Sequence, residues 1–333
     1  MAERNTKRVT SADVARMAGV SRATVSYVLN DTPHQTISAG TRGRVLDAAA
    51  SLGYAPSAAA RTLRTGRSDV VLCLLPDWPI GSEVGALLTH LSGALARRGL
   101  TLAVHPASRE DRPISELWKA LTPAAVLAFE EFSFAEITAM RAAGVALVVA
   151  LVGPARPERR ELHMSQRLVG RLQAEHLAGL GHTRLGYAYP DDDRLRYFAD
   201  PRLAGTREGC VDQGLAPPEV RTVPLDPATA AEAVAAWRAA GVTAVCAYND
   251  EVAMAVLAGV RRAGLVAPVD LAVIGVDDIP AARLAEPPLT TVTTDQAAVA
   301  IHLAGTVEAA IAGRPAPDPV PADVVRVVRR ESA

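Results

Sequence analysis

The chain has 333 residues, of which 49% are hydrophobic and 21% charged; this composition excludes a disordered polymer and predicts a globular protein of two or three units. The net charge of −1 conceals a split, because residues 1–67 carry ten basic and four acidic side chains whereas the remainder has a net charge of −7. A small basic segment on an acidic body favours contact with a polyanion, and a solvated charged face is the alternative interpretation.

The start of the chain and its cysteines bear on its compartment. Residues 1–8 carry charged side chains and lead into no apolar stretch typical of a signal peptide. No later segment approaches the roughly 20 apolar residues of a membrane span, so we expect a cytoplasmic protein. Cys73, Cys210 and Cys246 lie far apart in apolar runs and outside any CxxC motif, which predicts buried thiols without a disulfide framework or a zinc site.

The first two expected helices are separated by a very short turn. Thr10 can cap a helix over residues 11–18 with Asp13 at its third position, and a glycine then ends that helix. Ser21 can cap a second helix over residues 22–29, so the spacing predicts a helix-turn-helix. One face of the second helix is apolar and is expected to pack on the first helix. The opposite face carries Arg22, Ala23, Ser26 and Tyr27.

A third helix is expected over residues 44–52, with either Ser38 or Thr41 as its cap. Gly40 and Gly43 precede it, and each glycine in a helix costs about 1 kcal/mol relative to alanine. We therefore expect the start of this helix to fray. The alanine-rich segment that follows predicts a short helix that cannot hold itself together in water.

Short segments throughout this region form a specific pattern. They comprise residues 9–10, 13–15, 18–21, 24–26, 28–30, 41–42, 53–56 and 60–63. The pattern closely resembles the headpiece of the lactose-repressor/galactose-repressor (LacI/GalR) family of bacterial transcription regulators. A generic helix-turn-helix also fits a recombinase or a protein-binding domain, but the hinge segment that follows is typical of this family.

The resemblance implies DNA contacts from the second helix and from the hinge. The expected DNA-binding residues are Ser21, Arg22, Ala23, Thr24, Ser26, Tyr27, Asn30, Arg61 and Leu63. In the family the second helix lies in the major groove, where Arg22 can donate a fork to guanine O6 and N7. The hinge helices of two subunits pair over the minor groove, and Leu63 occupies the position of the leucine that wedges into the central base step.

From residue 69 onward, short apolar runs alternate with alanine-rich amphipathic segments. The apolar runs lie at residues 70–75, 101–104, 124–129 and 146–152, and the rhythm restarts at 184–189, 244–248 and 271–276. This alternation is typical of parallel sheets with crossover helices. We therefore predict an all-α helix-turn-helix headpiece followed by an α/β core of two doubly wound parallel-sheet lobes.

The expected domains follow from these patterns. They are a headpiece at 1–56, a hinge helix and linker at 57–67, and a two-lobed core for effector binding and dimerisation at 68–333. Within the core, the first lobe is expected at about 68–163 and 295–322, and the second at about 164–292 and 323–330.

Parts of the core also resemble the family. Residues 181–186, 202–205, 247–253, 273–278 and 287–292 resemble its regulatory core, which is similar to periplasmic sugar-binding proteins. The resemblance implies that Arg202, Asn249 and Asp277 hydrogen-bond an effector from the second lobe. These residues are expected at the carboxyl ends of parallel strands or in the loops beyond them, where ligands of such folds bind.

The first lobe departs from the family pattern. Residues 76–82 replace an Asn-Pro-Phe-Phe-like segment, and the aspartate expected after the fourth strand is missing from residues 150–153. Trp78 is either an effector-binding aromatic platform or a packing residue. We therefore expect a one-sided polar grip from the second lobe. Common monosaccharides should bind weakly, and a ligand with apolar or aromatic character should be preferred.

These observations predict a homodimeric transcriptional regulator, a repressor, that binds a near-palindromic double-stranded DNA operator. A small-molecule effector, sugar or sugar-like, is expected between the lobes, with no cofactor and no metal. A solute-binding protein would need an export signal and no headpiece. An enzyme would need a poised nucleophile or acid–base pair, and the sequence shows no such motif.

Overall fold

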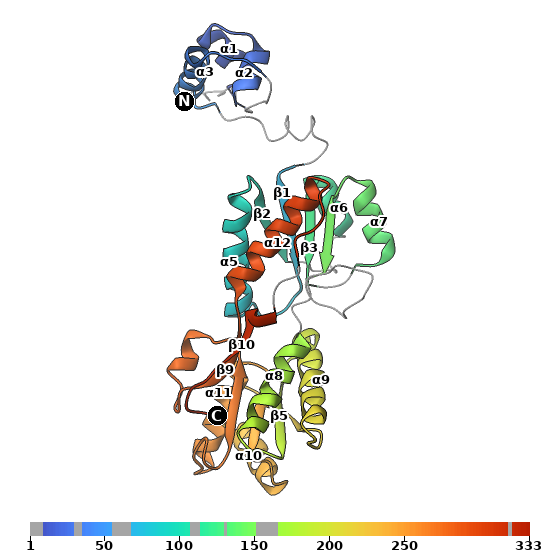
Figure 1. The fold of residues 1–333 in the computed structure, drawn as a ribbon, viewed down its shortest axis with the longest axis vertical. Helices are drawn as coiled ribbons and strands as arrows, with labels where there is room; N and C mark the ends of the chain where they lie inside the picture. The colour runs from blue at the N-terminus through green and yellow to red at the C-terminus, as the bar shows by residue number, and fades with distance from the viewer. Residues whose placement is uncertain are drawn as a thin grey trace, which may run out of the picture. The chain divides into compact units, whose positions relative to one another are not determined.

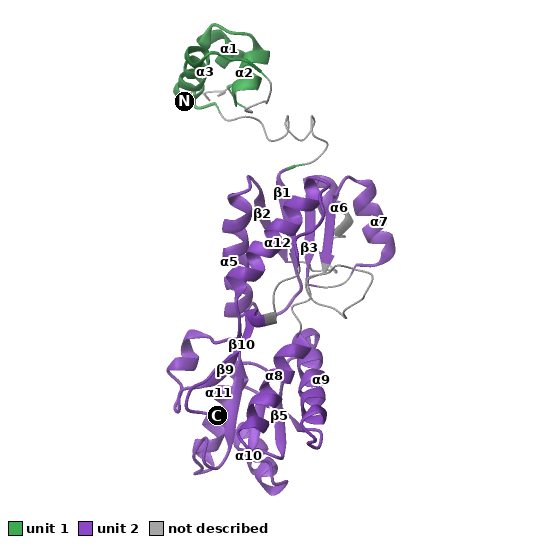
Figure 2. Ribbon diagram, viewed as in Figure 1, with its two compact units in different colours: residues 1–68 green, residues 69–333 purple. Residues whose placement is uncertain are grey.

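The computed structural model describes residues 9–29, 35–54, 68–106, 114–129, 132–150, 166–318 and 322–333. The chain divides into two units, residues 1–68 and residues 69–333 (Figure 2). The first is helical, and the second contains two sheets with covering helices (Figure 1).

The helical unit contains the predicted helix-turn-helix. Helix α1 (Ser11–Ala18) begins where the Thr10 backbone N–H donates to Asp13 Oδ2 at 3.0 Å, and it ends at Gly19, which adopts a φ of +67°. Helix α2 (Arg22–Leu29) begins where Ser21 Oγ accepts a hydrogen bond from the Thr24 N–H at 3.0 Å. These local bonds satisfy N–H groups that an uncapped helix end leaves unpaired.

Helix α3 (Ala39–Ser51) begins five residues earlier than predicted and includes both glycines. Ser38 is its cap, since Ser38 Oγ accepts from the Thr41 N–H at 3.2 Å. A small core holds the three helices together. Its buried members are Val14, Ala15, Ala18, Val25, Val28, Val45, Ala48 and Ala49.

The first lobe of the larger unit is built on a parallel sheet in the order β2-β1-β3-β4. Its strands are β1 (Val70–Leu75), β2 (Thr101–Pro106), β3 (Ala125–Ala128) and β4 (Leu147–Ala150). Its helices are α5 (Ser82–Ala96), α6 (Ile114–Leu121), α7 (Phe134–Ala142) and α12 (Gln296–Ile311). Strand β1 is apolar throughout because helices cover both faces: Cys73 packs in one core and Leu72 in the other.

The second lobe has a six-stranded sheet in the order β10-β9-β8-β7-β5-β6. Its strands are β5 (Leu185–Pro190), β6 (Glu219–Val223), β7 (Ala244–Ala247), β8 (Ala272–Val276), β9 (Thr290–Thr294) and β10 (Val325–Val328). Its helices are α8 (Gln166–Gly179), α9 (Arg196–Asp212), α10 (Pro227–Ala239) and α11 (Asp250–Arg262). All pairings are parallel except that of β10 with β9.

Each lobe is built from segments that are separated in the sequence. After β9 in the second lobe, the chain forms α12, which packs on α5 of the first lobe, and then returns as β10 (Figure 1). The predicted fold of two parallel-sheet lobes is confirmed, with an additional antiparallel edge strand. Cys73, Cys210 and Cys246 are fully buried free thiols, as predicted. Among the described helices, none is both long enough and apolar enough to cross a membrane.

Candidate functional site

The outer face of α2 presents the side chains that the sequence assigned to DNA. Arg22, Ala23, Ser26 and Tyr27 are exposed, whereas Val25 and Val28 of the same helix are buried. Ser21 is also exposed, and its hydroxyl lies 2.9 Å from the half-buried hydroxyl of Thr24. Three further predicted DNA contacts, Asn30, Arg61 and Leu63, lie outside the described residues.

The position of Arg22 gives this face its chemistry. Arg22 is the first residue of α2, at the end of the helix where backbone N–H groups favour anions. A guanidinium can donate two parallel hydrogen bonds to guanine, and a tyrosine hydroxyl such as that of Tyr27 can add a single bond. The α2 face therefore combines a group suited to phosphates with groups suited to base edges.

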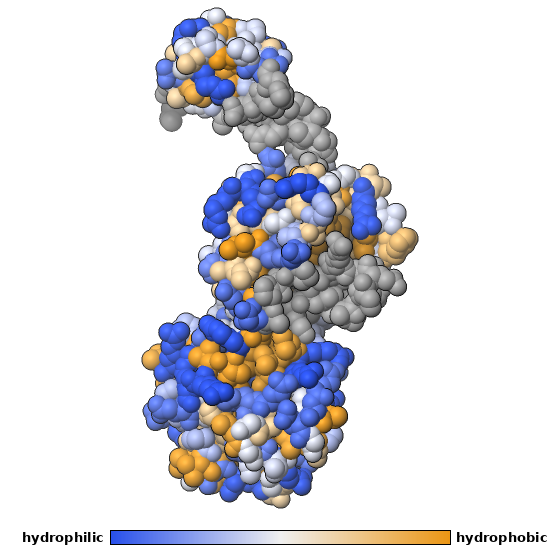
Figure 3. All heavy atoms as spheres, viewed as in Figure 1, coloured by the Kyte–Doolittle hydropathy of each residue, from blue (hydrophilic) through white to orange (hydrophobic). Residues whose placement is uncertain are grey.

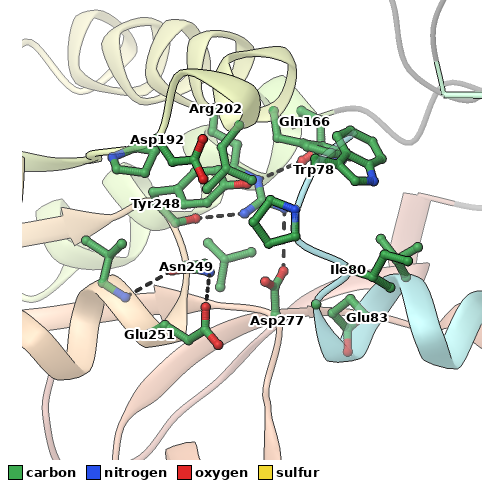
Figure 4. A pocket seen from close by; sticks show the side chains of 18 of the residues that line it. Trp78, Ile80, Glu83, Gln166, Asp192, Arg202, Tyr248, Asn249, Glu251 and Asp277 are labelled. Atoms are coloured by element: carbon green, nitrogen blue, oxygen red, sulfur yellow. Dashed lines mark hydrogen bonds and ion pairs between the residues drawn. The ribbon is translucent and has the colours of Figure 1, made fainter. Parts of the chain in front are cut away.

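A cavity of about 380 Å³ lies between the two lobes, within the size range of small-molecule sites. Its walls include all four predicted effector residues, Trp78, Arg202, Asn249 and Asp277 (Figure 4). Apolar side chains such as Leu195, Val223 and Val252 complete much of the wall. Apolar atoms also gather on the visible face of the second lobe at the end nearer the first lobe (Figure 3).

Arg202 is the buried cation of this cavity. The sequence predicted it at a strand end or in a loop, but it lies within helix α9. Its Nε donates to Gln166 Oε1 at 2.7 Å, its Nη1 donates to the Tyr248 carbonyl at 2.7 Å, and its Nη2 lies 3.4 Å from Asp277 Oδ1. The guanidinium also lies 4.9 Å from the centre of the Tyr248 ring. These contacts fix its orientation and occupy donors on all three nitrogens.

Glycines set the position of Arg202 by letting α8 and α9 approach closely. A Cβ atom on Gly170 would lie 1.9 Å from the Arg202 carbonyl oxygen, and one on Gly205 would lie 1.9 Å from the Arg167 carbonyl oxygen. Only residues without a side chain can occupy both sides of this crossing. The crossing places Gln166 of α8 beside Arg202 of α9.

Asn249 and Asp277 follow strands β7 and β8, as predicted. Asn249 is the N-cap of α11, where its Oδ1 accepts from the Val252 N–H at 3.0 Å. Asp277 has a φ of +110°, a region that residues with side chains rarely adopt. The turn after Asp277 is held by buried Asp250, whose carboxylate accepts from the Ile279 N–H at 2.9 Å.

Trp78 contributes to the cavity wall while its ring packs against other aromatic rings. Only 7% of Trp78 is exposed. Its ring centre lies 5.3 Å from that of Phe129 in the first lobe and 4.6 Å from that of Phe198 in the second. Trp78 therefore connects the two lobes at the edge of the cavity, a contact between lobes that the sequence did not predict.

The polar lining of the cavity comes from both lobes and not, as expected from the sequence, from the second lobe alone. The first lobe contributes Glu83 from the first turn of α5 and Gln296 from the first turn of α12 to the cavity wall. Gln296 Nε2 donates to Glu83 Oε2 at 2.8 Å. Burial and, to a lesser extent, the neighbouring charge of Asp277 raise the pKa of Glu83 from 4.5 to about 7, although the hydrogen bond from Gln296 opposes the shift.

Glu83 and Gln296 were not predicted from the sequence, because the family pattern in the first lobe concerned only residues 76–82 and 150–153. Glu83 lies just beyond the altered segment 76–82, and a carboxylate in the first turn of an expected helix was the available signal. Gln296 is separated from Glu83 by more than 200 residues, so no local pattern joins them. Gln166 and Tyr248, which fix Arg202, were missed for the same reason.

Comparison with known proteins gives consistent matches along the chain. Residues 10–57 match the family described as bacterial regulatory proteins, lacI family, and residues 174–333 match the periplasmic binding protein-like domain. The HTH-type transcriptional regulator GalS of Salmonella typhimurium is 31% identical, over 85% of this chain and 84% of its own. GalR of Escherichia coli is 28% identical, over 96% and 94%. The crystal structure of the Lac repressor dimer bound to operator and the anti-inducer ONPF superposes with a TM-score of 0.78 at 23% identity, over 98% of this chain and 99% of that chain.

Proposed function

The chain belongs to the LacI/GalR family of bacterial regulatory proteins, and we propose that it is a repressor controlled by a small molecule. It binds a near-palindromic operator as a homodimer in the cytoplasm. The effector, a sugar or sugar-like compound, binds in the cavity between the lobes and changes the affinity of the headpieces for DNA. The observation that carries this proposal is that one chain joins an exposed helix-turn-helix face to a two-lobed core with a cavity.

The DNA-binding half of the proposal rests on the α2 face. Arg22, Ala23 and Tyr27 read base edges in the major groove, while Ser21, Thr24, Ser26 and Asn30 hold phosphates or cap helices. The described members of this set other than half-buried Thr24 are exposed, which supports these roles. Arg61 and Leu63 act in the hinge, where Leu63 wedges into the central step of the operator.

The effector half rests on the cavity. Asp277 and Asn249 offer a carboxylate and an amide from the second lobe, and Arg202 holds both the Tyr248 carbonyl and the Asp277 carboxylate in place. Trp78 forms part of the apolar wall. A ligand that contacts both lobes favours the closed arrangement of the lobes because it binds that arrangement more tightly. Closure of the lobes in turn changes the conformation of the hinge.

This role is that of a regulator without catalysis, as in the transcriptional regulators that the chain resembles. The proposed direction of control is repression, since a dimer bound to an operator that overlaps a promoter obstructs transcription. The domain boundaries that we propose are 1–56 for the headpiece, 57–67 for the hinge and 68–333 for the core.

Footprinting of genomic DNA with the purified full chain tests the proposal. We expect protected sites with near two-fold symmetry, including sites near promoters, and half-sites about one helical turn apart. Replacement of Arg22 by alanine should reduce protection at those sites. Uniform protection without preferred sites, or protected sites without symmetry, would contradict the proposal.

A further inference from the structure

The described wall of the cavity carries more negative than positive charge. Its carboxyl groups belong to Glu83, Asp191, Asp192, Glu251 and Asp277, and Arg202 is the basic side chain among the described lining residues. Carboxylates gathered in a partly enclosed space raise the local concentration of cations and oppose the entry of anions.

The described basic side chains near this wall, Arg202 and Arg194, already have acidic or polar partners. Arg202 directs its donors at Gln166, Tyr248 and Asp277. Asp192 is bound by Arg194, whose Nε and Nη2 donate to it at 3.0 and 2.8 Å. Within the described part of the chain, no ion pair reaches the carboxylates of Glu83, Asp191 or Glu251. Among the described lining residues, an anionic ligand therefore meets no available guanidinium, whereas a cationic ligand meets carboxylates without an ion-pair partner.

A buried acceptor beside Glu83 also lacks a donor. Gln296 is 8% exposed, and its Nε2 donates to Glu83 Oε2 at 2.8 Å, which fixes the orientation of the amide. Its Oε1 is buried and has no hydrogen-bond partner among the described residues. A buried carbonyl left unpaired is unfavourable, so this position favours a ligand that donates. A primary ammonium group supplies three donors and a charge that suits Glu83.

The two lobes present their carboxylates to the same space. Glu83 comes from α5 of the first lobe and Asp277 follows β8 of the second, and both lie on the cavity wall (Figure 4). Aromatic rings of Trp78, Phe129 and Tyr248 form other parts of the wall. A cation bound between Glu83 and Asp277 would relieve repulsion across the cavity and hold the lobes together.

We propose that the effector is an organic cation: a hydroxylated, sugar-sized molecule whose primary ammonium group binds Glu83 and Gln296 Oε1 and faces Asp277. This inference rests on the proposed function, in which the cavity holds the effector. Hydroxyl groups on the same scaffold bind Asn249 and the second oxygen of Asp277. Glu83 is then the residue that distinguishes an amino compound from its neutral parent.

Titration calorimetry with the full chain tests this inference with matched probes. The probes are glucosamine, galactosamine and mannosamine, each compared with its parent hexose, its N-acetyl derivative and the corresponding uronic acid. At least one amine should bind about ten-fold or more tightly than its parent and its N-acetyl form. Glu83→Gln should remove this preference, and Glu232→Gln, which removes an exposed carboxylate of α10 outside the cavity wall, should retain it.

The inference is overturned if a parent hexose or a uronic acid binds as tightly as every amine. It is equally overturned if no amine binds at about 10 mM, or if Glu83→Gln keeps the preference. DNA binding separates these results from the proposed function. If the chain binds its operator and a neutral sugar alters that binding, only the charge of the ligand is wrong. If the chain binds no operator, the proposed function fails even when an amine binds.

Discussion

Arg202 is a buried cation that organises the cavity instead of leaving its charge available. Its three nitrogens contact Gln166, the Tyr248 carbonyl and Asp277, and its guanidinium lies over the Tyr248 ring. A buried guanidinium with all its partners in place is stable, but removal of one partner leaves an uncompensated charge. The polar groups of the cavity wall that Arg202 contacts are therefore positioned before any ligand binds.

Arg22 is expected to read one base in each half-site. Arg22→Ala should relax discrimination at one base pair of each half-site by about 1–3 kcal/mol, because it removes a two-bond contact to guanine. Fluorescence anisotropy with operators that vary at single positions measures this effect. Arg16→Ala is the matched control, since it removes an equal charge from α1, where Arg16 is exposed and paired with Asp13. Equal loss of discrimination in both variants would show that Arg22 contributes charge alone.

Glu83 should make stability depend on pH. Its pKa in the folded chain is raised from 4.5 to about 7 by burial and by the charges of Asp277 and Asp278, although Gln296 and Arg202 oppose the shift. Because the folded state then binds more protons between these values, the contribution of Glu83 to the free energy of unfolding is lost as pH rises from about 4.5 to 7.

Urea denaturation of the wild type and Glu83→Gln at about pH 5 and pH 7.5 checks this sign. The stability of the wild type relative to the variant should fall with rising pH, since other titrating groups are common to both proteins. A stability difference that stays constant between the two pH values would contradict the account of Glu83.

At the scale of elements, the crossing of α8 and α9 determines the geometry of the cavity. Gly170→Ala should destabilise the core by about 1–3 kcal/mol or more, because its new Cβ meets the Arg202 carbonyl. Chemical denaturation measures the loss. Gly179→Ala is the control on the same helix, where a Cβ meets no atom within 4 Å and should be neutral or slightly stabilising. Equal stabilities of the two variants would disprove the role of the crossing.

The hinge is the element that should bend the operator. Leu63→Ala should weaken specific binding and reduce DNA bending in a circular-permutation gel shift, because the wedge into the central base step is lost. Thermal unfolding of the core should be unchanged. Leu284→Ala, which replaces an exposed leucine of the core, serves as control and should bend DNA as the wild type does. Unchanged bending by Leu63→Ala would exclude Leu63 as the wedge.

Elements with local signals could be predicted, and those defined by distant partners could not. The capping residues Thr10 and Ser21 and the apolar run of β1 are local, and the corresponding elements were found. Strand β10 was missed because it is short, half-exposed and paired with β9 across the intervening α12. The start of α3 was placed late because the cost of Gly40 and Gly43 counted against it, although Ser38, one of the two caps considered, caps the helix.

The cavity shows the same limit. Arg202, Asn249 and Asp277 could be named because each lies within a short segment of family pattern. Glu83 and Gln296 become neighbours only when α5 packs on α12, which no short segment encodes. From the sequence, Trp78 was either an aromatic platform for the effector or a packing residue. In the structure it packs against Phe129 and Phe198 and also lines the cavity.

At the scale of the whole molecule, charge is divided between the two functions. Residues 1–67 carry a net charge of +6 and the rest of the chain −7. The basic part suits a polyanion, while the acidic remainder repels DNA and thereby restricts binding to the headpiece. This division predicts that DNA affinity is strongly dependent on salt and that specificity comes from the α2 face.

The most direct test is the dissociation constant of the full chain for a footprinted operator and for a scrambled duplex, measured by fluorescence anisotropy at several salt concentrations. We expect operator affinity to fall at least about ten-fold between about 50 and 200 mM salt, through release of counterions from contacted phosphates. At physiological salt the operator should be preferred by about 10³-fold or more. An affinity that is flat with salt, or equal for the two duplexes, would contradict the central claim that this chain is a sequence-specific DNA-binding regulator.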